Sequence, residues 1–265
     1  MIHAFGPLKL VPYDQGVVEI ILSDGQRGNP IDAAFCDAID GISVQLAGMS
    51  GVRSVLFRAE GPSFSVGGDL KSLAADPLAT PELVLRMTRV LNGAIVRLQE
   101  LDAPLVAAIE GACAGGMVGF VAGCDLVISS DRARFVSAYA SIGYSCDAGV
   151  STMLPRRLGI ARARRFLLLN ETLDAAAAQS AGLVDIVVCS NDLLARSKAI
   201  ASQIAAGPTR AFGETRRLLN SALTQTFTQQ LQSEALALAR TTATADAREG
   251  VAAFLQKRTP TFRGI

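Results

Sequence analysis

Two pairs of glycines stand where this chain could hold an oxygen that becomes negatively charged. Gly67-Gly68 and Gly115-Gly116 each follow an apolar segment and precede a segment with helical spacing. Glycine lets another group approach the backbone because it has no Cβ atom, and the first N–H groups of a helix have no partner inside the helix. Two such N–H groups aimed at one oxygen would form an oxyanion hole. Close packing of a helix on a strand is the alternative explanation for either pair alone.

Few other residues are available for chemistry. His3 is the single histidine, which argues against a Ser-His-Asp triad, a Cys-His dyad or a multi-histidine metal site. Acid–base work therefore falls to carboxylates, tyrosine or lysine. The five cysteines are scattered, without C-x-x-C spacing, and predict reduced thiols in a cytoplasmic protein. They are Cys36, Cys113, Cys124, Cys146 and Cys189.

The overall composition predicts a globular protein with a sizeable core. Half of the 265 residues are hydrophobic, and 25 basic residues balance 24 acidic ones to give a net charge of +1. This balance gives no reason to expect nucleic acid or a membrane surface as partner. We also expect no transmembrane span, because the apolar runs are short, and no signal peptide at the N-terminus.

Hydrophobic spacing predicts the elements that must position these residues. Strands and helices alternate up to residue 190 with short connections, which is typical of an α/β fold. The remaining residues, 191–265, have helical spacing throughout. The predicted strands are 8–12, 17–22, 52–59, 105–109, 125–129, 133–136 and 183–188. The predicted helices are 31–49, 82–101, 148–158, 161–169, 175–181, 192–206, 208–224, 227–242 and 246–257.

The two glycine segments together resemble the signature of a known family. FSVGGDLKS and AAIEGACAGGMVGFVAGCDLVIS are similar to the paired motifs of the crotonase (enoyl-CoA hydratase/isomerase) superfamily, and the likeness extends over nearly the whole chain. The resemblance implies a core of ββα units, 1–190, and a helical C-terminal region, 191–265, that assembles a homotrimer or a dimer of trimers. It also implies acyl-CoA thioester substrates, with coenzyme A arriving on the substrate and no further cofactor. The enolate oxygen would bind between the N–H groups of Gly68 and Gly116.

The sequence departs from the hydratase pattern at both acid–base positions. Similar hydratases carry two glutamates, which align here with Gly119 and Tyr139. Hydration needs a base to activate water and an acid to protonate the α-carbon. Ordinary hydratase activity is therefore expected to be weak or absent.

One carboxylate, Asp147, lies in the same block and could take over proton transfer. Capping the predicted 148–158 helix is the alternative role for its side chain. An aspartate at this place is the acid–base residue of the family's dienoyl-CoA and ring 1,2-epoxyphenylacetyl-CoA isomerases, and the nucleophile of 4-chlorobenzoyl-CoA dehalogenase. Tyr139 and Asn92 stand where that dehalogenase has a tryptophan and a histidine, which favours an isomerase. Apolar neighbours would disfavour the charged form of Asp147 and suit it to proton transfer near neutral pH.

The resemblance leaves other activities open and suggests further contacts. An atypical hydratase or lyase, an aryl-CoA dehalogenase or hydrolase, and a non-catalytic acyl-CoA scaffold are the alternatives. Tyr144 would line the acyl pocket with Asn92 and Tyr139, unless it is simply a packed aromatic residue. The CoA moiety is expected to contact Arg27, Asn29, Ile31, Val66, Gly68, Lys71, Phe254 and Lys257, the last two by closing over it, including from a neighbouring subunit.

Overall fold

A seven-stranded sheet forms the centre of the computed structural model, which describes residues 2–265. Its order is β1-β2-β3-β4-β5-β7-β10, and the strands from β3 onward pair in parallel. β3 and β5 are buried along their whole length, as expected of parallel strands covered on both faces. The strands are β1 (His3–Phe5), β2 (Leu8–Pro12), β3 (Val17–Leu22), β4 (Ser54–Ala59), β5 (Leu105–Ile109), β7 (Leu126–Ser130) and β10 (Ile186–Val188).

A second sheet carries one of the glycine pairs. It consists of β6 (Ala112–Ala114), β8 (Arg134–Val136) and β9 (Thr172–Asp174), with β6 and β8 parallel. The predicted strand at 133–136 belongs to this sheet, whereas β6 was not expected from the sequence. Because β6 ends directly before Gly115, this sheet fixes the position of the second glycine turn.

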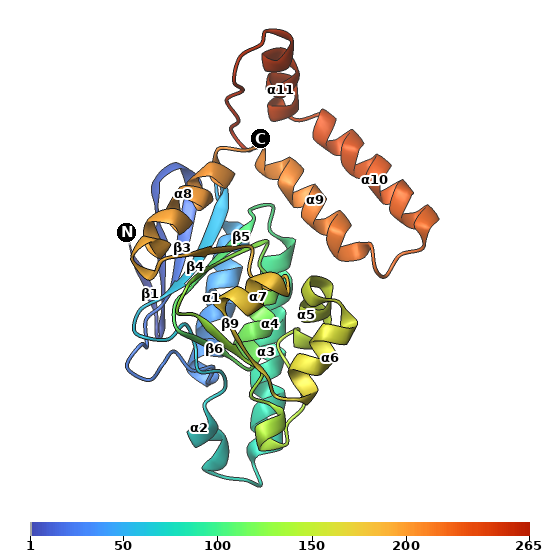
Figure 1. Ribbon diagram of the computed structural model, residues 1–265. Coiled ribbons are helices and arrows are strands. Elements are labelled where there is room, and N and C mark those ends of the chain that lie inside the picture. Colours follow the sequence, from blue (N-terminus) through green and yellow to red (C-terminus); the bar gives the residue numbers. More distant parts are fainter. Residues whose placement is uncertain (1) are drawn as a thin grey trace.

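Helices cover both faces of the main sheet (Figure 1). α1, α3 and α4 share one apolar core with it, and α8 packs on the opposite face against β4, β5 and β7. α8 lies in the predicted C-terminal helical region, 191–265, and packs on the sheet; the division of the chain at residue 190 stays a prediction. The helices are α1 (Ala33–Gly48), α2 (Leu70–Ala74), α3 (Thr80–Glu100), α4 (Gly116–Ala122), α5 (Val150–Leu158), α6 (Ile160–Leu168), α7 (Ala175–Ser180), α8 (Leu193–Ala205), α9 (Thr209–Ser221), α10 (Phe227–Thr242) and α11 (Ala245–Leu255).

A buried carboxylate ties α8 to the sheet. Glu19 on β3 is 2% exposed, although its neighbours on the strand are apolar. Its two carboxylate oxygens accept from Arg58 Nε at 2.6 Å and from Lys198 Nζ at 2.7 Å. A buried carboxylate needs such partners because removing its charge from water is costly. Glu19 therefore has a structural role.

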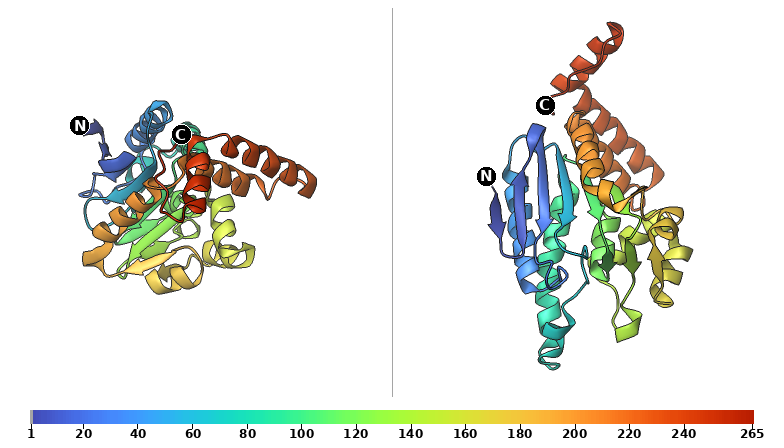
Figure 2. Two further views of the ribbon diagram at one scale, coloured as in Figure 1. Left: turned by 90° about the horizontal axis from the view of Figure 1, so that it is seen from above. Right: turned by 60° about the vertical axis from the view of Figure 1, so that its left-hand side comes forward.

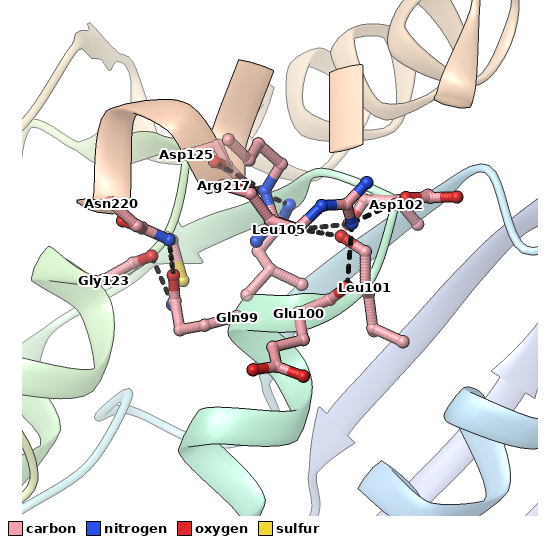
Figure 3. A network of polar contacts seen from close by, with 12 residues as sticks. Gln99, Glu100, Leu101, Asp102, Leu105, Gly123, Asp125, Arg217 and Asn220 are labelled. Carbon is pink, nitrogen blue, oxygen red and sulfur yellow. Dashed lines mark hydrogen bonds and ion pairs between the residues drawn. The ribbon is translucent and has the colours of Figure 1, made fainter. Parts of the chain in front are cut away.

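The last three helices, α9 to α11, extend away from the sheet (Figures 1 and 2). Polar contacts fix α9 to the end of α3 and the segment that follows it (Figure 3). Arg217 Nη1 donates to Asp102 Oδ1 at 2.8 Å, and Asn220 Nδ2 donates to Gln99 Oε1 at 3.3 Å. Gln99 in turn donates to the carbonyl oxygen of Gly123 at 2.7 Å. The base of this region is thus held rigidly on the core.

These helices expose several large apolar side chains among their polar ones. These include Leu219, Leu223, Phe227, Leu231, Leu238 and Val251. Exposed apolar surface of this kind marks interaction sites. Assembly into trimers through this region stays a prediction. Across residues 2–265, no helix combines the length and the apolar character that crossing a bilayer requires.

Candidate active site

The two glycine turns lie side by side because their flanking segments are hydrogen-bonded. Ser65 N donates to the carbonyl oxygen of Ala112 at 2.9 Å, and Ala114 N donates to that of Ser65 at 3.0 Å. Gly67 follows with a φ of +83°, and a Cβ atom there would lie 3.0 Å from the carbonyl oxygen of Ala114. Glycine is therefore needed at this position for both its conformation and its close approach to the second turn.

Two backbone N–H groups beside this junction have no acceptor. The amides of Gly68 and Gly116 donate to no atom of the described chain, although the neighbouring residues Gly115 and Asp69 do. Gly115 N bonds to Val136 O at 3.0 Å and Asp69 N bonds to Ile31 O at 3.1 Å, so the backbone on either side is fixed. Unpaired amides held this way can stabilise an oxygen that acquires negative charge.

A mainly apolar cavity of about 820 Å³ opens at the two turns. Its wall includes both glycine pairs, residues of α2 and α3, and the loop 138–147. Such a cavity suits an apolar acyl group whose polar end is fixed at a few groups. The apolar wall residues include Leu70, Leu73, Val84, Met87, Leu91 and Ile142.

Asp147 lies in the cavity wall, next to the second glycine turn. A Cβ atom added to Gly116 would be 2.9 Å from Asp147 Oδ1. Tyr139 Oη donates to the same oxygen at 2.5 Å. α5 begins only at Val150, with Gly149 as its N-cap and no capping side chain. The carboxylate of Asp147 is thus not used as a helix cap, contrary to the alternative drawn from the sequence.

The surroundings of Asp147 are more open than expected. In the single chain the residue is solvent-exposed, not enclosed by apolar side chains. Asp147 is exposed because it lies in a loop that forms part of the wall of an open cavity. No lysine or arginine of residues 2–265 forms an ion pair with it. Its carboxylate is therefore not neutralised by a cation of the described chain.

The place expected for a hydratase glutamate is closed. A Cβ atom on Gly119 would lie 2.5 Å from Val150 Cγ2, 2.7 Å from Val150 N and 2.8 Å from the carbonyl oxygen of Ala148. Two of these three atoms belong to the backbone, so a changed side-chain rotamer cannot make room. The start of α5 occupies the space that a side chain at this position would need.

Three of the residues expected to bind CoA line the cavity. These are Ile31, Val66 and Gly68. Asn29 is 2% exposed, and its amide group donates to the carbonyl oxygens of Glu60 and Ser63 at 3.0 and 2.9 Å. The amide nitrogen of its side chain therefore holds the loop, and a contact of Asn29 with CoA stays a prediction.

Arg27 and Lys71 lie outside the cavity wall. Arg27 is held by three carboxylates, those of Asp24, Asp32 and Asp69, at 2.8 to 3.0 Å. Its guanidinium therefore fixes the loops around the first glycine turn. Lys71 is exposed in the first turn of α2. A contact of either residue with CoA stays a prediction.

On α3, the residue that lines the cavity is the neighbour of the expected one, and a role of Asn92 in the pocket stays a prediction. Asn92 is exposed and does not line the cavity, whereas Leu91 does. Val84, Met87 and Leu91 recur at helical spacing and form the face that turns to the cavity. This periodicity was the signal that could have found them. Tyr139 and Tyr144 both line the cavity, as predicted for the acyl pocket.

Phe254 and Lys257 do not reach the cavity of their own chain. They lie at the C-terminal end of α11 and just after it. In Figure 1, α11 and α2 are at opposite ends of the molecule. Phe254 is 83% exposed. Closure over CoA by these residues, including from a neighbouring subunit, stays a prediction.

Known proteins similar to this chain carry out more than one reaction. The model of the family described as "Enoyl-CoA hydratase/isomerase" matches residues 13–264. The 1,2-epoxyphenylacetyl-CoA isomerase of Escherichia coli K12 is 32% identical over 95% of this chain and 96% of its own. The 4-chlorobenzoyl coenzyme A dehalogenase-2 of an Arthrobacter species is 31% identical over 82% of this chain and 79% of its own. An enoyl-CoA hydratase structure from Polaromonas sp. JS666, 31% identical, superimposes with a TM-score of 0.91 over 97% of this chain and 100% of that one.

Proposed function

The chain belongs to the enoyl-CoA hydratase/isomerase family and has its α/β crotonase fold, and we propose that it is an isomerase that moves a double bond in an acyl-CoA thioester. The observation that carries the proposal is the position of Asp147. Its carboxylate lies beside Gly116 at the cavity, caps no helix and is paired with no cation of the described chain. The apolar cavity wall supports an apolar acyl group as substrate.

The thioester carbonyl would bind at the two unpaired amides. Its oxygen would accept from the N–H groups of Gly68 and Gly116, which have no acceptor in the described chain. Removal of a proton from the acyl group places negative charge on this oxygen as an enolate. The two N–H groups would stabilise that charge without having to reorient during the reaction.

Asp147 would then transfer the proton. The carboxylate removes a proton from one carbon of the acyl chain, and the electron pair of that C–H bond moves into the enolate. The resulting carboxylic acid returns the proton to another carbon, and the double bond is left in its new position. No water is added and nothing leaves, so a single acid–base group suffices.

Hydration is less well supported by the same site. It would need a second acid–base group at Gly119 or Tyr139, and the space at Gly119 is filled by the start of α5. Tyr139 carries a phenol, and burial and the neighbouring charge of Asp147 raise its pKa well above its usual range. A phenol with a raised pKa is a poor base for activating water at neutral pH.

The test compares the wild-type protein with Asp147→Asn on enoyl-, dienoyl- and arylacetyl-CoA thioesters in deuterated water. Loss of the base should reduce double-bond migration and deuterium incorporation by about 10²- to 10⁴-fold. Thioester binding and thermal stability should be retained, because the side chain holds no structural contact except the one with Tyr139. Unchanged turnover of this variant would refute the proposal.

Asp192→Asn is the matched control. Asp192 is also exposed and also precedes a helix, α8, without capping it by its side chain. We expect wild-type exchange in this variant. Binding of thioesters by the wild-type protein without any exchange would instead support a non-catalytic scaffold. Halide release from an aryl-CoA substrate would support a dehalogenase.

A further inference from the structure

The loop that carries Asp147 is closed by one side chain. It runs between β8 and α5, and Tyr139 at its start meets Asp147 near its end. Tyr139 Oη donates to Asp147 Oδ1 at 2.5 Å, and the backbone N–H of Asp147 donates to Tyr139 Oη at 3.4 Å. One hydroxyl group thus contacts both the side chain and the backbone of the proposed base.

Strained residues flank this contact on both sides. Ala138, directly before Tyr139, has a φ of +66°, and Ala148, directly after Asp147, has a φ of +49°. Alanine in this region is strained and persists only where the surrounding structure enforces it. The side chain of Ala148 is buried against the second glycine turn, 3.3 Å from where a Cβ atom of Gly116 would be. The packing that enforces this strained conformation therefore holds Asp147 and Tyr139 in a defined place beside that turn.

The phenol leaves one oxygen of Asp147 available. Tyr139 occupies Oδ1, whereas Oδ2 has no hydrogen-bond donor anywhere in the described chain. Burial and the adjacent charge of Asp147 raise the pKa of Tyr139, so the hydroxyl remains a donor at neutral pH. The other titratable neighbours are the thiols of Cys36 and Cys146. Burial raises the pKa of Cys36 to about 12, so this thiol stays neutral as well.

We infer that Tyr139 is a positioning residue, which fixes the Asp147 carboxylate through Oδ1 so that Oδ2 faces the reacting carbons. The inference rests on the proposed function of Asp147. It extends the role of Tyr139 beyond lining the acyl pocket, because it assigns the two carboxylate oxygens different tasks. A carboxylate free to rotate would present the wrong oxygen, or none, for part of the time.

The test is Tyr139→Phe, which keeps the ring and removes the hydroxyl. The kcat for proton exchange should fall about 10- to 100-fold, the effect of a lost hydrogen bond to a charged group, while KM changes little. A steric role in the pocket would change KM and leave kcat in place.

Two further variants serve as controls, so that a failure of the positioning role can be distinguished from a failure of the proposed function. Tyr13→Phe removes a tyrosine hydroxyl outside the cavity, where the ring lies 4.5 Å from Lys198 Nζ, and should exchange protons at the wild-type rate. In the double variant Tyr139→Phe/Asp147→Asn, the tyrosine change should cause no loss beyond that of Asp147→Asn.

If Asp147→Asn alone retains exchange, the proposed function is wrong. If Asp147→Asn abolishes exchange while Tyr139→Phe keeps the wild-type kcat, only the positioning role is wrong. An additive loss in the double variant would likewise overturn the inference, because Tyr139 would then act independently of Asp147.

Discussion

Glu19 and Asp147 occupy two regions that differ in how the fold satisfies a carboxylate. Glu19, between β3 and α8, is 2% exposed, and both of its oxygens are bound to cationic side chains. Asp147 is exposed in the cavity wall, has one neutral donor and sits next to a strained alanine. The comparison teaches that a fully paired carboxylate stabilises the structure, whereas a carboxylate left partly unpaired at a cavity is available for chemistry.

Among the variants that distinguish these two regions, Gly116→Ala should have the largest effect. It should reduce turnover, because it disturbs only the cavity region. The added Cβ atom would lie 2.9 Å from Asp147 Oδ1 and 3.3 Å from Ala148 Cβ, so the carboxylate must move. A displacement of this size in a reacting group can reduce turnover about 100-fold. Steady-state kinetics of proton exchange measure it. Gly123→Ala, at the other end of α4, meets first the flexible side chain of Gln99 and serves as control. Equal losses in both variants would contradict a local effect at Asp147.

Glu19→Gln should act on the other region and reduce stability. It leaves Arg58 and Lys198 without their shared anion. We expect a loss of about 3 kcal/mol, the lower end for breaking a buried ion pair, because both cations reach solvent. Urea unfolding measures the loss, and kcat per folded molecule should be unchanged. Glu60→Gln breaks the surface pair with Lys9 and should cost at most about 1 kcal/mol. Equal losses would mean that burial of Glu19 contributes nothing.

The stability contributed by Glu19 should depend on pH. Burial raises the pKa of Glu19, but hydrogen bonds from Lys198 and Arg58 outweigh it and hold the pKa below its usual value. The unfolded chain therefore binds this proton more readily than the folded one, and the contribution is complete above the unfolded pKa of about 4.3. It disappears as pH falls through the folded pKa. The gap in unfolding free energy between wild type and Glu19→Gln should thus be constant from neutral pH down to about 5 and shrink in stronger acid. A constant gap would refute the lowered pKa.

Ala148→Gly should have the smallest effect, and in an unusual direction. Glycine adopts a φ of +49° without strain, so relief of strain offsets the greater freedom of the unfolded chain. We expect an unfolding free energy equal to or up to about 1 kcal/mol above that of the wild type. Ala199→Gly, at an exposed position inside α8, should instead cost roughly 0.5–1 kcal/mol. Thermal unfolding of both variants measures the difference. A matching loss in both would show that Ala148 is not strained.

Much of this arrangement could be predicted because it depends on local patterns. The α/β alternation and the two glycine turns could be predicted from apolar segments joined by residues that permit positive φ. The fold class and the family resemblance are confirmed. Tyr139 and Asp147 were found by position in a motif, and both line the cavity.

Other features depend on contacts that no local pattern contains. The exposure of Asn92 follows from how α3 is rotated against α1, and the inward position of Asn29 follows from two distant carbonyl groups. Positive φ at Ala138 and Ala148 could not be predicted, since alanine rarely adopts it. The hydrogen bond that joins Tyr139 to Asp147 depends on this conformation. The packing of α8 on the sheet could not be predicted, because its apolar face looks the same whether it packs on a sheet or on helices.

The crowding at Gly119 has a consequence for how activities can diverge among related proteins. A single substitution to glutamate would be blocked by backbone atoms of Ala148 and Val150. Shortening Val150 beforehand would clear only one of the three contacts. A lineage starting from this chain would therefore have to reroute the loop before the acidic residue could be accepted. The two changes are coupled, and the first brings no benefit without the second. Single mutations would therefore rarely lead from this chain to a hydratase. To introduce the glutamate in the laboratory, the loop should be exchanged instead of single residues.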